Sequence, residues 1–185
     1  MPAAKPPARA APLAVEPVTP GRWEDFAALF EARGSPHYCW CAPYRFADAH
    51  KMDKAQKRAA MRERVKAGTP VGVLAYRDGA PVGWCSVAPR EAYDKLDRAT
   101  SMPRMDDAPT WTVLCFFVPR PHRGQGIAAA LLAGAVEAAR SGGARVVEGW
   151  PHDAAGTTAT HRGSVALFEA AGFRVEGRRA VLRLG

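Results

Sequence analysis

The residues best suited to hold a ligand form a glycine-rich turn in the C-terminal half of the chain, Arg123-Gly124-Gln125-Gly126-Ile127-Ala128. The turn lies between an apolar run over 110–118 and an alanine- and leucine-rich run over 126–139. Glycine lets the backbone approach a ligand closely, and the free N–H groups at the start of a helix attract negative charge. Arg120 and His122 add positive charge beside the turn. The turn therefore predicts a site for a phosphate or pyrophosphate group.

A dinucleotide site is one interpretation of this turn. Gly124, Gly126 and Ala129 satisfy the pattern G-x-G-x-x-G/A, and Glu148 follows 24 residues after Gly124, as a ribose-binding acid would. In dinucleotide folds the strand runs almost directly into the first glycine, whereas residues 119–123 intervene here. Such folds also need several further strand–helix units, and only about 35 residues follow Glu148. A different phosphate site is therefore favoured.

A second unusual segment is His37-Tyr38-Cys39-Trp40-Cys41. Its thiols and imidazole invite a zinc site, but no second Cys or His pair stands at finger-like spacing, so no metal is predicted. A nucleophilic cysteine would need a base and a lowered pKa. The aromatic side chains either wall a binding pocket or pack beneath the first helix, and the sequence leaves both readings open. Cys85 and Cys115 are expected inside strands.

Composition limits the class of protein. The chain has 185 residues, 48% of them hydrophobic, which suits one globular domain over 13–185 after a disordered Ala/Pro-rich tail over 1–12. No apolar run is long enough to cross a membrane and no signal peptide is visible, so a cytoplasmic protein with reduced thiols and no membrane partner is expected. The net charge of +8 is dispersed, so an anionic ligand is favoured but not nucleic acid.

Hydrophobic periodicity and turn residues predict the elements that position these groups. Helices are expected over 20–33, 53–67, 126–139 and 164–171, with a short one over 91–98 inside a long loop. Strands are expected over 13–18, 71–76, 81–87, 110–118, 144–150, 173–175 and 180–184. The main elements follow in the order β-α-α-β-β-β-α-β-α-β-β. This order predicts a single-domain α/β fold with a mixed sheet.

The stretch VPRPHRGQGIAAALL resembles the acetyl-CoA-binding motif of the GNAT superfamily of N-acyltransferases, written R/Q-x-x-G-x-G/A. Arg123 opens the motif, Gly126 is its central glycine and Ala128 takes the last place. The element order is similar too, as is the segment SVALFEAAGF, which ends in Gly172-Phe173. The resemblance covers about residues 13–184. It implies a GNAT-like fold with acetyl-CoA as co-substrate.

The resemblance also implies where acetyl-CoA would bind. The pantetheine arm would follow the edge of the 110–118 strand, and the pyrophosphate would lie on the N–H groups that open the next helix. The implied cofactor-binding residues are Phe116, Phe117, Val118, Arg123, Gly124, Gln125, Gly126, Ile127, Ala128 and Phe168. Aromatic residues in the loops, Tyr38, Trp40 and Trp150, would bind the acceptor.

Acyl transfer to an amine needs a base, a donor for the oxyanion and a proton for the leaving thiolate. A backbone N–H near Phe116 is the expected oxyanion donor. The tyrosine that many family members place in the late helix is Phe168 here, which has no proton to give, so Ser164 or a water is the expected acid. Glu148 is the favoured base and His152 an alternative, although Glu148 could instead form an ion pair with an arginine.

These observations predict transfer of an acetyl group from acetyl-CoA to a primary amine of a small molecule or protein, by direct attack in a ternary complex. A non-catalytic domain that binds or senses acyl-CoA on the same fold is the alternative, motivated by Phe168. The exposed strand edges and the C-terminal hairpin make a homodimer plausible.

Overall fold

A computed structural model of the chain describes residues 12–96, 98–152 and 161–185. In that part of the chain, seven strands form one sheet in the order β1-β2-β3-β4-β5-β7-β6. The strands are β1 (Ala14–Pro17), β2 (Val73–Arg77), β3 (Ala80–Pro89), β4 (Thr110–Phe117), β5 (Val146–Gly149), β6 (Arg174–Glu176) and β7 (Arg179–Arg183). Only the β4–β5 pair is parallel among these strands. The predicted mixed α/β fold is confirmed.

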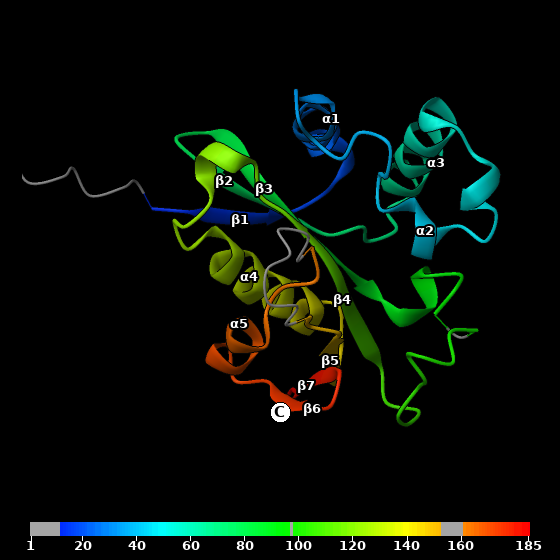
Figure 1. The fold of residues 1–185 in the computed structure, drawn as a ribbon, viewed down its shortest axis with the longest axis vertical. Coiled ribbons are helices and arrows are strands. Elements are labelled where there is room, and N and C mark those ends of the chain that lie inside the picture. The colour runs from blue at the N-terminus through cyan, green and yellow to red at the C-terminus, as the bar shows by residue number, and fades with distance from the viewer. Residues whose placement is uncertain (1–11, 97, 153–160) are drawn as a thin grey trace, which may run out of the picture.

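The helices cover both faces of the sheet (Figure 1). One face carries α1 (Trp23–Glu31), α2 (Ala42–Arg45) and α3 (Lys54–Lys66), and the other carries α4 (Ile127–Ser141) and α5 (Val165–Ala170). The four-residue helix α2 was not expected. The tail predicted over 1–12 lies, apart from Pro12, outside the described residues.

The short helix predicted over 91–98 is wrong. The chain forms a single 3-10 turn over Arg90–Ala92 and becomes extended at Tyr93. Arg90 and Tyr93 are each 1% exposed and point into the protein. Arg90 donates to the Glu148 carboxylate, and the Tyr93 hydroxyl donates to Thr112 O. These buried contacts replace the exposed polar face that a surface helix would present.

Each face of the sheet has its own core. On the α4 face the core is mostly aliphatic, and Leu131 and Ala135 of α4 are fully buried in it. On the other face it is aromatic, because the i, i+3, i+7 spacing of α1 turns Trp23, Phe26 and Phe30 toward the sheet. A helix is thus present within the predicted range 20–33, as α1, and its aromatic side chains face the sheet.

Strands β4 and β5 separate halfway along β4. Their pairing runs from Thr110–Val146 to Val113–Gly149 and then stops. At the same point the register between β3 and β4 shifts, because Ser86 pairs with Cys115 while Val87 pairs with Val113, which leaves Leu114 as an extra residue on β4. A bulge of this kind bends its strand. The result is an opening between the C-terminal ends of β4 and β5, next to the turn that leads from β4 into α4.

Candidate functional site

The glycine-rich turn at the end of β4 forms an open backbone cradle. Gly124 and Gly126 have φ of +72° and +74°, a left-handed conformation that residues with a side chain rarely adopt. A Cβ at either position would meet no atom within 4 Å, so the space above both glycines is open. The first intrahelical bond of α4 runs from Ala130 N–H to Gly126 O. The N–H groups before Ala130 are therefore directed out of the helix end, as an anion site requires.

Side chains of the turn brace its backbone. Arg123 Nε donates to Val118 O at 3.0 Å, and Gln125 Nε2 donates to Pro121 O at 2.9 Å. The side-chain oxygen of Gln125, Oε1, in turn accepts a hydrogen bond from Arg77 of β2. Ile127 is 2% exposed and belongs to the core. The side chains of Arg123 and Gln125 thus hold the predicted residues 123–128 in one turn.

Aromatic rings line the opening between β4 and β5. The ring of Phe168 lies 6.2 Å from that of Phe116 and 5.1 Å from that of Phe173, and it is fully buried. A Cβ at Gly149 would lie 2.6 Å from the Phe168 ring, so this ring packs directly on the end of β5. Phe117 turns to the opposite face, where it packs on Phe30. Phe116 and Phe168 therefore lie on one side of the sheet, and Phe117 lies on the other.

The backbone N–H that we expect to face an acyl group has a partner. Phe116 N–H donates to His161 O at 2.5 Å, and His152 N–H donates to Gly163 O at 3.0 Å. The segment before α5 thus lies across the opening between the two strands. For Phe116 N–H to bind a ligand, it would exchange its bond to His161.

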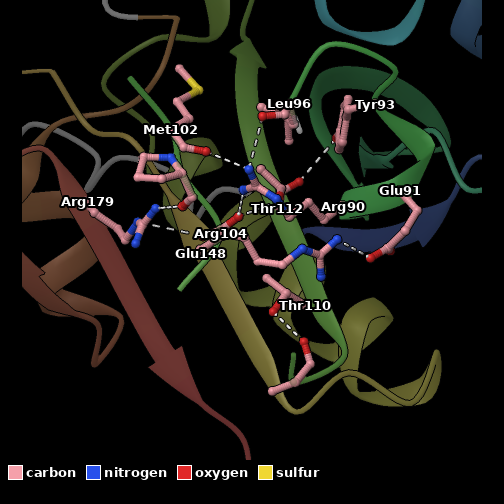
Figure 2. A network of polar contacts seen from close by, with 12 residues as sticks. Arg90, Glu91, Tyr93, Leu96, Met102, Arg104, Thr110, Thr112, Glu148 and Arg179 are labelled. Carbon is pink, nitrogen blue, oxygen red and sulfur yellow. Dashed lines mark hydrogen bonds and ion pairs between the residues drawn. The ribbon is translucent and has the colours of Figure 1, made fainter. Parts of the chain in front are cut away.

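Glu148 pairs with Thr112 on β4, one residue before the two strands separate. Its side chain is 1% exposed. Figure 2 shows it among Arg90, Arg179 and Thr112. Its Oε1 accepts hydrogen bonds from Arg90 at 2.5 Å and from Thr112 at 3.0 Å. Its Oε2 lies 3.7 Å from Arg179 Nε. Of the two readings that the sequence left open, the structure therefore shows the ion pair.

Arginines 90 and 179 are parts of this site that sequence reasoning missed. Arg90 also donates to the carbonyls of Leu96 and Met102, at 3.1 and 2.5 Å, so it ties the long loop after β3 to the sheet. Both guanidinium groups lie near the Trp150 ring, 5.9 Å from its centre for Arg90 and 5.3 Å for Arg179. Nothing in the local sequence distinguishes them from the other basic residues.

Ser164, the predicted proton donor, caps a helix. Ser164 is the N-cap of α5, and its Oγ accepts a hydrogen bond from Leu167 N–H at 3.2 Å. A hydroxyl that accepts in this way keeps its own proton for donation. His152, the alternative base, is exposed just after β5.

The predicted acceptor residues lie in different environments. Trp40 is fully buried, stacked on Trp23 and Phe30, so its assignment to an acceptor pocket is wrong; it packs beneath α1 because the loop turns its ring into the aromatic core. Tyr38 is 68% exposed. Trp150 lines a cavity of about 710 Å³. The other lining residues are Ser101, Pro103, Met105, Gly172, Arg174, Glu176, Arg178, Arg179, Val181, Leu182 and Arg183.

Comparison with known families identifies the chain. A model of the Acetyltransferase (GNAT) family matches residues 24–173. The chain belongs to this family. The resemblance predicted from the glycine-rich turn is confirmed, and with it acetyl-CoA as the co-substrate of an acetyltransferase.

Solved structures share the fold of this acetyltransferase. The yncA protein of Salmonella typhimurium, solved with its cofactor acetyl-CoA, is 16% identical with a TM-score of 0.53, over 94% of both chains. Polyamine N-acetyltransferase from Drosophila melanogaster is 16% identical with a TM-score of 0.56, over 94% of this chain and 100% of the other. Ribosomal-protein-alanine N-acetyltransferase from Brucella melitensis is 18% identical with a TM-score of 0.54, over 92% and 99%.

Three negative findings complete the comparison. No curated protein sequence is similar enough to match it. Within the described residues, no helix combines the length and the apolar character needed to cross a membrane. No group of three potential metal ligands gathers in that part of the chain either.

Proposed function

We propose that this acetyltransferase transfers the acetyl group of acetyl-CoA to a primary amine by direct attack in a ternary complex. The observation that carries the proposal is the opening between β4 and β5 beside the glycine cradle at the start of α4. The two features lie at the same end of the sheet. They place an anion site next to backbone groups of β4 that have no partner on β5.

Acetyl-CoA supplies an activated acetyl group when bound. Different groups of the chain would bind its different parts. The N–H groups of residues 125–128 would hold the pyrophosphate, with the positive end of α4 behind them. Phe116 N–H would exchange its bond to His161 O for one to the acetyl carbonyl. Phe168 would pack against the thioester end, because its ring already lies between the ends of β4 and β5.

Acceptor and proton transfers form a further part of the proposal. We assign the acceptor to the cavity over Trp150, since this predicted aromatic residue lines it, whereas Trp40 is fully buried in the core. Ser164 stays the proposed proton donor to the leaving thiolate. Glu148, whose two oxygens face arginines, is proposed as a positioning residue that fixes Arg90 and Arg179 beneath Trp150, and no longer as the base.

The proposal is tested by introducing a negatively charged side chain into the glycine-rich turn. Gly126→Asp should abolish acetyl-CoA binding, because a carboxylate would enter the open space beside the helix end and repel the phosphates. The left-handed backbone adds about 1–2 kcal/mol of strain, which the fold should tolerate. Gly143→Asp is the matched control, because Gly143 has φ of +81° and open space at the other end of α4.

The readouts are calorimetric affinity for acetyl-CoA and the circular-dichroism spectrum of both variants. Gly126→Asp should fold and fail to bind, while Gly143→Asp should fold and bind with parental affinity. A folded Gly126→Asp protein with parental affinity would remove the co-substrate from this cradle.

A sensing domain is the second candidate function, favoured by Phe168, which places a ring without a proton at the expected acid position. Release of free thiol from acetyl-CoA across a panel of primary amines separates the two candidates. Turnover on any amine supports the transferase. Tight binding of acetyl-CoA without turnover on any of them would favour the sensor.

A further inference from the structure

Arg45 is fully buried without a carboxylate partner. Its Nη2 donates to Val71 O at 2.7 Å, to Ser86 Oγ at 2.8 Å and to Tyr93 Oη at 3.1 Å. Its Nε has no hydrogen-bond partner, and no Asp or Glu of the described residues forms an ion pair with it. Arginine keeps its proton in proteins, so this buried positive charge requires a negative group nearby.

The Cys41 thiol lies beside the Arg45 guanidinium and can become negatively charged. Cys41, 4% exposed, lies with its Sγ 3.3 Å from Ser86 Oγ, the same hydroxyl that Arg45 contacts. Ser86 pairs across the sheet with Cys115 of β4, and Cys115 packs against the same aromatic cluster that contains Cys41. Two sulfurs from distant parts of the chain therefore lie in one cluster beside the guanidinium.

The surroundings favour ionisation of one thiol and not of the other. The hydrogen bond from Cys115 and the charge of Arg45 lower the pKa of Cys41 to about 6, in spite of burial. The same hydrogen bond, together with burial, raises the pKa of Cys115. Burial raises the pKa of Cys39 and of Cys85 as well. One thiolate and one thiol in contact form the usual arrangement of an attacking and a resolving cysteine.

We propose that Cys41 and Cys115 form a peroxide-sensitive thiol pair, in which Arg45 stabilises the Cys41 thiolate. Cys41 is 4% exposed, so hydrogen peroxide would have to enter from the side of Cys115, which is only partly buried. The inference concerns a modification site beneath α2 and does not depend on acetyl transfer.

The proposed chemistry has two balanced steps. The Cys41 thiolate attacks one peroxide oxygen, the O–O bond breaks, and the departing hydroxide takes a proton to give water and a sulfenic acid. The Cys115 sulfur then attacks the Cys41 sulfur, the S–O bond breaks, and the hydroxide leaves as water with the Cys115 proton. Two electrons from the two sulfurs reduce one peroxide to two waters and leave one disulfide.

The experiment treats the full chain with hydrogen peroxide at neutral pH and maps the products by mass spectrometry without reductant. We expect one disulfide that links the peptides of Cys41 and Cys115. Cys115→Ser should stop at a sulfenic acid on Cys41, which dimedone traps, and Cys41→Ser should form no disulfide. Cys39→Ser is the matched control, because it removes a neighbouring thiol and should leave the Cys41–Cys115 bond intact.

The role of Arg45 has its own arm. Arg45→Met should slow oxidation of Cys41 by about tenfold at pH 7, because only a few per cent of an ordinary thiol is ionised there. The isosteric serine variants keep the proposal testable even where Arg45→Met does not fold. A disulfide between Cys39 and Cys41, or a chain whose Cys41 stays reduced while other thiols oxidise, would overturn the proposal.

Discussion

Arg45 and Arg90 are both at most 1% exposed and lie on the same face of the sheet, yet their charges are balanced differently. Arg90 meets the Glu148 carboxylate at 2.5 Å. Arg45 meets carbonyls, hydroxyls and the Cys41 thiol, with no carboxylate partner among the described residues. The first balance is an ion pair between a guanidinium and a carboxylate. The second depends on a thiol that can gain or lose a proton.

This difference predicts how the Arg45 and Arg90 sites should respond to mutation, pH and oxidation. Removing Glu148 leaves a charge on Arg90 that cannot be discharged, whereas removing Arg45 lets Cys41 take up a proton. The Arg90 site should therefore be rigid and sensitive to mutation. The Arg45 site should be more tolerant, and should report on pH and oxidation.

The largest expected effect follows from breaking the ion pair between Arg90 and Glu148. Glu148→Ala should lower the free energy of unfolding by about 3–5 kcal/mol, because Arg90 is left buried without its counter-charge. Urea unfolding measures the loss. The matched control is Glu91→Ala, which removes an exposed partner of Arg104 beside the same network and should cost about 1 kcal/mol or less (Figure 2).

A double variant sharpens this test. Replacing both partners, with Arg90→Met and Glu148→Leu, should recover much of the loss, because no charge then stays buried. A loss below about 1 kcal/mol for Glu148→Ala alone would mean that Arg90 finds another counter-charge. The contrast with Arg45 would then disappear.

The thiol balance predicts a stability that depends on pH. The unfolded thiol has a pKa near 8.5, and the Cys115 hydrogen bond and Arg45 lower the pKa of Cys41 to about 6 in the folded chain. Because the folded pKa is the lower one, the Cys41 contribution is complete above about pH 8.5 and is lost as the pH falls to about 6.

Relative to Cys41→Ser, the parent chain should therefore lose about 3 kcal/mol of stability between pH 8.5 and pH 6. Urea unfolding across this range measures the difference. Cys39→Ser should keep the parental slope, because burial raises the pKa of Cys39. Equal slopes for the parent and Cys41→Ser would show that Cys41 is not the counter-charge.

Removal of the arginine itself should cost less than removal of Glu148. Arg45→Met should lower the free energy of unfolding by about 1–3 kcal/mol at pH 7.5, the cost of removing the donor to the carbonyls Pro70 O and Val71 O. Cys41 would regain a proton, so no charge would stay buried. Urea unfolding beside Glu148→Ala tests the order, and a larger loss for Arg45→Met than for Glu148→Ala would contradict it.

The fold was predictable from the sequence, since its signals are local. The apolar spacing of α1, the uncharged run of β4 and the glycines around residue 125 each lie within one segment. The two arginine sites were not predictable. Apart from Cys41, the hydrogen-bond acceptors of Arg45 lie 25 to 48 residues away, and Glu148 lies 58 residues from Arg90. Among 26 basic residues, nothing local marks the two whose partners the folded sheet supplies.

The smallest expected effect concerns the hydroxyl that joins Arg45 to β4. Tyr93 Oη accepts from Arg45 at 3.1 Å, contacts Ser86 Oγ at 3.0 Å and donates to Thr112 O at 3.1 Å. Tyr93→Phe removes these bonds while the ring keeps its cation–π contact with Arg45, whose guanidinium carbon lies 4.4 Å from the ring centre. Urea unfolding should show a loss of about 0.5–1.5 kcal/mol, the usual net value of a buried hydrogen bond. Because Thr112 also bonds to Glu148, a loss that is not additive with that of Glu148→Ala would show that the two arginine sites are coupled through β4, whereas additive losses support two separate sites.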